Sequence, residues 1–256
     1  LALLPVLGGC ASSGVNQGDF NLVSLEEEWQ LGQQLERDVN QKVRLANDAT
    51  LQRYVESLGQ RLVAQTELAN LPWSFHVVAD PQINAFNIPG GHVYVNTGLI
   101  AASGDVAELA GVMAHEIAHG TARHGTEQLT RSYGLSLIAG AALGQNPETY
   151  QQILAQVLGG GALAKFSRDA EREADTLGIR YMARAGYDPL GMARMFETLL
   201  SQRRRQPSVV EQFFSSHPLT EERIREVRQE AQRVGGGGTS RDPSFAGVRD
   251  RARRYN

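Results

Sequence analysis

The sequence has almost no cysteine and no strong excess of charge of either sign. One cysteine, Cys10, occurs in 256 residues, which excludes both a disulfide framework and a cysteine-ligated metal site within the chain. The formal net charge of -3 gives no reason to expect nucleic acid or an acidic substrate. With 41% hydrophobic and 21% charged residues, the composition is that of an ordinary globular chain.

Long hydrophobic runs are also missing. The most apolar pieces, residues 135–143 and 153–163, are rich in Gly and Ala, and both are shorter than the roughly 18 residues that a membrane helix needs. We expect them to form helices of a soluble lid or core. Since cysteine ligands are excluded, any metal that this chain holds must have His and carboxylate ligands.

A His-Glu-x-x-His motif lies within an apolar stretch, from His115 to His119. Four residues apart, the two histidines share one face of a helix and can hold one Zn²⁺ between them. Glu116 lies about 100° around that helix, where it can take a proton from a zinc-activated water without binding the metal. Asp105 to Glu108 form a capping box that starts this helix. Burying two histidines and a glutamate there is unfavourable unless a metal pairs them, which favours zinc over histidines that are merely hydrogen-bonded.

The third zinc ligand is not a nearby histidine. The residue six positions past His119, where one class of zinc proteases has its third histidine, is Gly125. His124 is nine residues beyond His115, about 180° around a continuous helix. We therefore expect His124 to be a structural or surface residue.

An acidic segment downstream offers a better third ligand. Helical spacing places Glu171 and Asp175 on one inward face, whereas Glu173 falls on a solvated face with Arg180. We predict that Glu171 binds the zinc and that Asp175 accepts the N–H of a ligand histidine, His115. Two histidines, one glutamate and an open position are typical of catalytic rather than structural zinc.

The remaining segments predict an α+β fold that is mostly helical. Capping signals indicate helices after Ser24 and Asp48, and strand signals occur at residues 73–78 and on both sides of 89–91. A strand that carries Asn84, Ala85 and Phe86 beside the zinc helix is a candidate substrate-binding edge for an extended peptide. An ordinary hairpin that supports the core explains the same pattern equally well.

The two ends of the chain differ from the predicted domain at residues 24–234. Leu7-Gly8-Gly9-Cys10 resembles the end of a bacterial lipoprotein signal, in which the cysteine is lipidated; the alternative is an apolar end with a stray thiol. In such signals, Ala11 after the cysteine implies sorting to the outer membrane. We expect residues 11–23 to form a flexible tether, and residues 235–256 to form a Gly linker and a basic, disordered tail.

The combined motifs resemble those of the gluzincin metallopeptidases, the family that includes the CAAX prenyl endopeptidase and HtpX. They are H-E-x-x-H, S-R-x-x-E-x-x-A-D and N-A-F-x-x-P-G-G-x-V-x-V, and the soluble BepA-like and LoiP-like lipoproteins are the most similar members. The resemblance implies a helical fold with a small sheet beside the active-site helix, one zinc per chain and proteolysis. It also places His217 and Arg223, in a downstream S-H-P…E-R motif, near the metal. Either could stabilise an oxyanion. His217 could instead fill the fourth zinc position, or it could be a structural histidine that caps its own loop.

Two departures from the family narrow the expected role. The membrane helices of HtpX-type members are absent, which argues against prenyl substrates, and no C-terminal helical repeat follows as in BepA-like proteins. We expect a zinc endopeptidase on the periplasmic face of the outer membrane, held there by Cys10, that cleaves misfolded or misassembled envelope proteins. The alternative is a chaperone-like assembly factor whose zinc site is latent or mainly structural.

Overall fold

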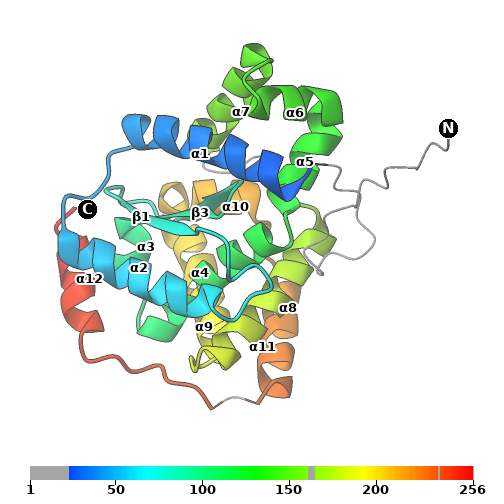
Figure 1. Cartoon of the computed structure of the whole chain (residues 1–256). Coiled ribbons are helices and arrows are strands. Elements are labelled where there is room, and N and C mark those ends of the chain that lie inside the picture. The colour runs from blue at the N-terminus through cyan, green and yellow to red at the C-terminus, as the bar shows by residue number, and fades with distance from the viewer. Residues whose placement is uncertain (1–22, 161–164, 236, 256) are drawn as a thin grey trace.

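The computed structural model describes residues 23–160, 165–235 and 237–255; Cys10, the signal-like segment and residues 11–22 of the expected tether lie outside them. The described residues form mostly helices and one small sheet, which confirms the predicted α+β class (Figure 1). The helices are α1 (Leu25–Lys42), α2 (Ala49–Val63), α3 (Thr97–Ala102), α4 (Val106–Thr121), α5 (His124–Tyr133), α6 (Leu135–Ala142), α7 (Pro147–Gly160), α8 (Arg168–Arg184), α9 (Leu190–Arg205), η1 (Pro207–Val209), α10 (Glu211–Ser216), α11 (Glu221–Arg233) and α12 (Phe245–Arg253). The strands are β1 (Ser74–Val78), β2 (Ala85–Ile88) and β3 (His92–Asn96).

The sheet has the order β1-β3-β2, so β2 lies at an edge. Strand β3 pairs in parallel with β1 and antiparallel with β2. Gly90 and Gly91 both have positive φ, 85° and 76°, which allows the tight turn that joins β2 to β3. The two strands predicted on either side of residues 89–91 are therefore confirmed.

Alternating side chains give the sheet two buried faces. Val93 and Val95 of β3 pack into the larger core with α2, α4, α8 and α9, whereas Tyr94 between them packs into a second core with α1, α6 and α7. This alternation is the normal consequence of the two-residue period of a strand. The sheet is thus sandwiched between α1 on one side and α4 on the other.

Close helix packing brings α8 and α9 onto α4. At Gly111 of α4, an added Cβ would lie 2.6 Å from the Cα atom of Met192 in α9. At Gly178 of α8, an added Cβ would lie 3.1 Å from the carbonyl carbon of Ala114 in α4. Small residues at these contacts let the backbones approach, and so α8 delivers its acidic residues to the histidines of α4.

The C-terminal segment corrects one expectation from the sequence. Residues after Gly238 were predicted to be disordered, but Phe245, Val248 and Ala252 form a buried stripe of α12 that packs against α3 and α2 (Figure 1). Tyr54 of α2 also donates a 2.8 Å hydrogen bond to Asp242. The arginine-rich composition concealed a helix in which three apolar residues at helical spacing supply the contact.

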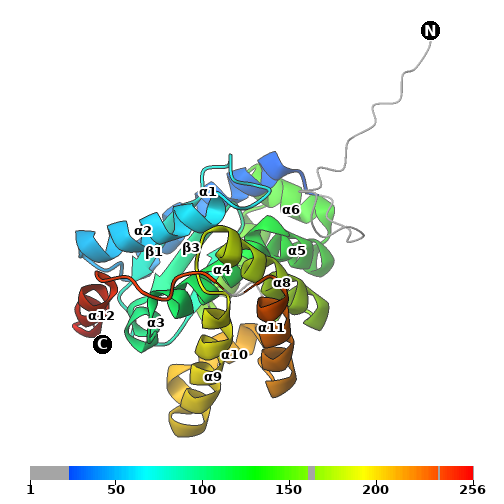
Figure 2. The ribbon, with the colours of Figure 1, turned by 90° about the horizontal axis from the view of Figure 1, so that it is seen from below.

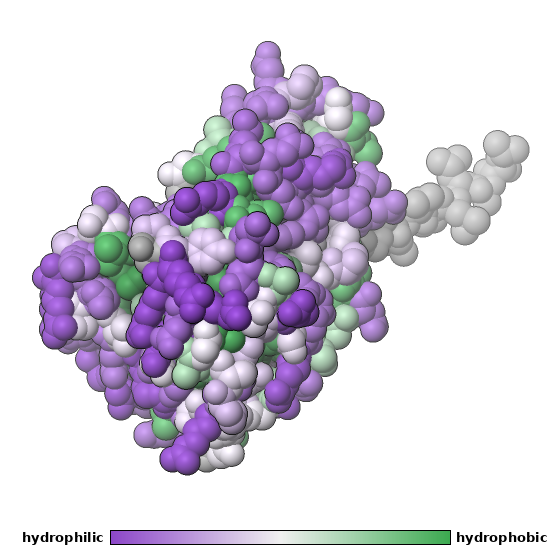
Figure 3. All heavy atoms as spheres, turned by 90° about the vertical axis from the view of Figure 1, so that its left-hand side faces the viewer, coloured by the Kyte–Doolittle hydropathy of each residue, from purple (hydrophilic) through white to green (hydrophobic). Residues whose placement is uncertain are grey.

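The described surface is largely polar. In Figure 3 hydrophilic residues dominate one face, and hydrophobic residues are confined to small areas of it. Within the described ranges, every helix is too short or too polar to span a bilayer. The apolar helices α6 and α7 pack against each other and against α1.

Candidate metal centre

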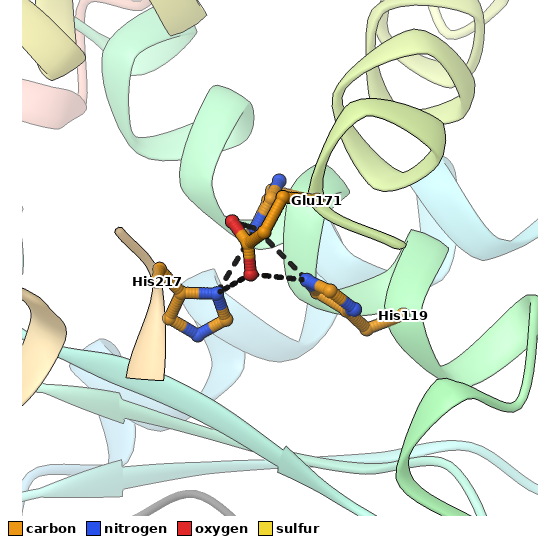
Figure 4. Close-up of side chains that lie close together, drawn as sticks. His119, Glu171 and His217 are labelled. Atoms are coloured by element: carbon orange, nitrogen blue, oxygen red, sulfur yellow. Dashed lines mark hydrogen bonds and ion pairs between the residues drawn. The ribbon is translucent and has the colours of Figure 1, made fainter. Parts of the chain in front are cut away.

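Four buried side chains from three parts of the chain meet at one point. His115 and His119 come from α4, Glu171 from α8, and His217 directly follows α10. One donor atom from each residue lies within 4.8 Å of all the others. Figure 4 shows the carboxylate of Glu171 between the imidazoles of His119 and His217. From the sequence, helical spacing selected His115 and His119 on one helix and Glu171 on another as candidate ligands, and the family resemblance placed His217 near the metal.

The donor set fits a metal ion. The Nε2 atoms of His115 and His119 are 3.0 Å apart, and Glu171 Oε1 lies 2.9 Å from His217 Nδ1 and 3.5 Å from His119 Nε2. Two ligands at roughly 2.0–2.1 Å from a tetrahedral ion lie about 3.3 Å apart. Each of the four side chains is at most 2% exposed. Convergent nitrogen and carboxylate donors at this spacing, shielded from water, are suited to a metal.

Asp175 orients His115 from the side away from the other donors. Its Oδ1 lies 2.9 Å from His115 Nδ1, as the one-turn spacing from Glu171 predicted. Arg223 of α11 in turn donates two hydrogen bonds to Asp175, of 2.5 and 2.9 Å, and also pairs with Glu171. A carboxylate that fixes the outer nitrogen selects the imidazole tautomer whose Nε2 is available to a metal.

His124 orients His119 in a similar way, which the helical-wheel reasoning missed. Its side chain is buried, with Nδ1 2.9 Å from Nδ1 of His119 and Nε2 3.3 Å from Glu173 Oε2. Glu173, expected on a solvated face, is only 30% exposed and takes part in this chain of contacts. Of the two alternatives expected for His124, the structure therefore favours the structural one, and it corrects the solvated placement of Glu173.

The reason for this miss is a sharp turn between α4 and α5. Arg123 is the only described non-glycine residue with positive φ, 60°, and it redirects the backbone so that His124 returns to His119. Such a conformation is unfavourable by roughly 1–3 kcal/mol and needs support from its surroundings. Here the buried Arg123 side chain bonds Glu28 Oε2 and the Val23 carbonyl, each at 2.6 Å. A continuous helix could not place His124 in this position.

Glu116 is buried beside the donor atoms. Its Oε1 lies 3.4 Å from His217 Nε2, and its carboxylate accepts a backbone hydrogen bond from Asn87 of β2. Burial raises the pKa of Glu116 above the ordinary glutamate value, although His217 and His115 oppose this. A carboxylate with a raised pKa is better matched to accepting and returning protons near neutral pH.

At His119 and Glu171, the electrostatics favour the protonation states that metal ligands require. Burial lowers the pKa of His119 well below its ordinary value, so its imidazole is neutral. Burial acts to raise the pKa of Glu171, but His217, His119 and Arg223 together hold it well below the ordinary value. A neutral imidazole and an ionised carboxylate are the metal-binding forms of these groups.

The predicted substrate edge is only partly directed at this centre. The Phe86 ring stacks on Tyr94 in the second core, with centroids 4.8 Å apart, and the Asn84 carbonyl already accepts a hydrogen bond from Asn96. Ala85 packs into the larger core. Asn87, which sequence reasoning did not single out, faces α4.

Asn87 approaches α4 at a glycine. A Cβ added at Gly120 would lie 2.8 Å from Asn87 Nδ2 and 2.7 Å from the ring of Trp73. The sequence held a signal for this approach, because Gly120 directly follows the second histidine of the motif. The contact places β2 beside the helix that carries Glu116.

Comparisons with known proteins agree with the geometry. The model of peptidase family M48 matches residues 49–231. The beta-barrel assembly-enhancing protease of Escherichia coli (strain K12) is 33% identical over 245 residues, with 90% of this chain and 47% of the relative covered. The mitochondrial metalloendopeptidase OMA1 of Schizosaccharomyces pombe is 32% identical over 222 residues, with coverage of 84% and 64%. The chain spans about half the length of the bacterial relatives that it matches.

Proposed function

The chain belongs to peptidase family M48, and we propose that it is a zinc-dependent endopeptidase that cleaves misfolded or misassembled proteins of the bacterial cell envelope. The observation that carries this proposal is the buried set of His115, His119, Glu171 and His217 donors with the Glu116 carboxylate beside it. A structural zinc site has no use for an adjacent carboxylate with a raised pKa, whereas hydrolysis does.

The chain's own residues divide the chemical work. Bound zinc would polarise a scissile carbonyl and lower the pKa of water. Glu116 accepts the proton of the attacking water and returns it to the leaving amine. Asp175 and His124 hold the two helix histidines in the required tautomers. The contacts of Arg223 with Glu171 and Asp175 favour a positioning role over the oxyanion role considered from the sequence.

His217 is proposed to close the resting site. Its Nδ1 lies 2.9 Å from Glu171 Oε1 and 3.3 Å from His115 Nε2, within the ligand set, so that it can fill the fourth position and exclude water. The experiment is His217→Ala. A latch predicts faster cleavage of an unfolded model substrate. A hundredfold fall with zinc retained would instead assign His217 to the oxyanion, since such donors contribute about 10²–10³ in rate.

The substrate is proposed to bind as an extended strand along β2. This strand lies at the edge of the sheet, and its Asn87 contacts Glu116, so that a paired peptide would run past the metal centre. Asn84, Ala85 and Phe86 contribute backbone to the same strand or its start. The side chains of Ala85 and Phe86 pack into the two cores and so keep this edge in place.

The proposed location is the periplasmic face of the outer membrane. It rests on the signal-like sequence that ends at Cys10 and on similarity to a protease named for β-barrel assembly. Cys10→Ser should then release the protein from membranes without changing its purified activity. Unaltered fractionation would contradict the anchor and leave the peptidase proposal intact.

Trapping substrates in the native envelope tests the function directly. Glu116→Gln protein should retain metal and accumulate uncleaved envelope polypeptides that the parent protein degrades. The control is His119→Ala, which removes a metal donor from the same helix. If the active parent protein recovers the same polypeptides, uncleaved and in the same amounts as Glu116→Gln does, the chain acts as a binding or assembly factor.

A further inference from the structure

A groove with a basic lining lies between α9 and α11, apart from the metal centre. The two helices run side by side in Figure 2, and between them is a cavity of about 550 Å³. Its apolar part is formed by Leu200 of α9 and Ile224 of α11. The groove therefore offers a small hydrophobic floor between two polar walls.

The charges in this groove do not balance. Four arginines and two glutamates line it. Arg204 pairs with Glu221, and Arg228 pairs with Glu197 across the groove. The charged residues that line the groove are Arg204, Arg205, Arg225, Arg228, Glu197 and Glu221. Within the described part of the chain, Arg205 and Arg225 make no ion pair, which leaves an excess of two positive charges.

The neighbouring Arg203 does not contribute to the charge of the groove. Its guanidinium lies 4.4 Å from the centre of the Phe214 ring, so it is turned onto another part of the fold. Arg205 and Arg225 are exposed, one on each helix that forms the groove. Two exposed guanidinium groups flanking an aliphatic floor are complementary to a peptide with carboxylates on either side of an apolar side chain.

We propose that the groove between α9 and α11 docks an acidic peptide segment of a partner polypeptide, with an aliphatic side chain on Leu200 and Ile224 and carboxylates at Arg205 and Arg225. Its concave shape fits a chain segment and not a flat bilayer. The two glutamates that remain in the lining disfavour a dense polyanion. This docking goes beyond the proposed peptidase activity and does not depend on it.

The groove walls are backed by residues of the metal centre. Phe196, next to Glu197, lies under the Arg223 guanidinium at 5.1 Å and near the His115 ring at 6.1 Å. Arg223 itself directly precedes Ile224. A docked peptide would therefore tie together the two helices that carry these residues, and we expect slower amide hydrogen exchange in 197–205 and 221–228 when it binds.

Binding is tested with the full Glu116→Gln chain, so that cleavage cannot remove the probe. The probe is a synthetic peptide with Glu and Leu at helical spacing, measured by calorimetry, and the control peptide has Lys in place of Glu. We expect saturable binding of the acidic peptide alone, weakened at least tenfold by Arg205→Glu with Arg225→Glu. Arg53→Glu, at an exposed arginine of α2, should change it less than twofold.

Three results would overturn the proposal. They are equal binding by the Lys peptide, an unchanged affinity in the double variant, and slowed exchange confined to segments outside α9 and α11. Stronger binding to phosphatidylglycerol vesicles than to the peptide would assign the surface to a lipid instead. Because Arg53, Arg205 and Arg225 are exposed, their substitution should leave the fold intact, and thermal unfolding of each variant against the Glu116→Gln chain checks this.

Discussion

Two clusters in the described part of this protein bring histidines together around a glutamate, yet only one of them has the geometry of a metal site. In the second cluster, Glu36 of α1 meets His76 of β1 and His92 of β3, with Ser74 between them. A single oxygen, Glu36 Oε1, lies 2.7 Å from His76 Nε2, 2.7 Å from Ser74 Oγ and 3.2 Å from His92 Nδ1. Its carboxylate is thus already engaged by the groups around it.

The metal centre differs in where the imidazole nitrogens point. There, the outer nitrogens of His115 and His119 are held by Asp175 and His124, which frees the inner nitrogens to converge. Among the described residues, this is the single group of donors close enough together to hold an ion. Residue type alone does not make a metal site, because the hydrogen-bond partners of the ligand side chains decide which of their atoms remain available to a metal.

The largest expected effect is on Glu116. Glu116→Gln removes the proton acceptor and keeps the shape, so the rate of peptide cleavage should fall by about 10²–10⁴-fold with metal content unchanged. The matched change in the other cluster, Glu36→Gln, should leave cleavage within about twofold. Steady-state kinetics on an unfolded substrate measure both, and a loss below tenfold for Glu116→Gln would refute its role as base.

The zinc content of purified variants should distinguish the roles of Glu171 and Glu173, two acidic residues of α8. Glu171→Ala removes a donor, and purified protein should lose its zinc, whereas Glu173→Ala should largely retain it. Because Glu173 contacts His124, which orients His119, we expect at most a weaker affinity, by about 10–100-fold. Metal analysis and chelator competition test this ranking, and zinc loss confined to Glu173→Ala would reverse the ligand assignment.

Removal of Arg223 should destabilise the metal-free fold. Its guanidinium compensates two buried carboxylates, Glu171 and Asp175, so Arg223→Ala should lower the free energy of unfolding by about 3–5 kcal/mol. The control is Arg172→Ala at an exposed pair with Glu226, where solvent screening predicts a much smaller change. Urea unfolding of both proteins in the presence of chelator gives the comparison. Equal changes would contradict the buried network.

The smallest expected effect is in the second cluster. Glu36→Gln should lower the free energy of unfolding at pH 7 by about 1–2 kcal/mol, since it weakens charge-assisted hydrogen bonds. The hydrogen bond from His92 holds the pKa of Glu36 well below its ordinary value of 4.5. Because the folded-state pKa is the lower one, this stabilisation is full above about pH 4.5 and is lost as the pH falls below it. Unfolding measured at a series of pH values should show that the difference in free energy of unfolding between Glu36→Gln and the parent protein becomes smaller as the pH falls.

Local spacing was sufficient to predict much of the fold and part of the site. Because 3.6 residues make one helical turn, the four-residue separation of His115 and His119 places both on one face of a helix, and the same holds for Glu171 and Asp175. The turn at residues 89–91 also follows from local chemistry, since adjacent glycines there adopt positive φ. Such features depend on neighbours in sequence and need no knowledge of packing.

The sequence by itself therefore determined the two helices that supply donors, the face of each that turns inward and the strand pair beside them. Only the tertiary structure decided that His124 returns to His119, through the left-handed turn at Arg123 that Glu28 of a distant helix supports. It likewise decided that Arg223 compensates Glu171, and that an arginine-rich tail folds as α12. These features depend on contacts between segments far apart in sequence, whose positions become fixed only when the helices pack.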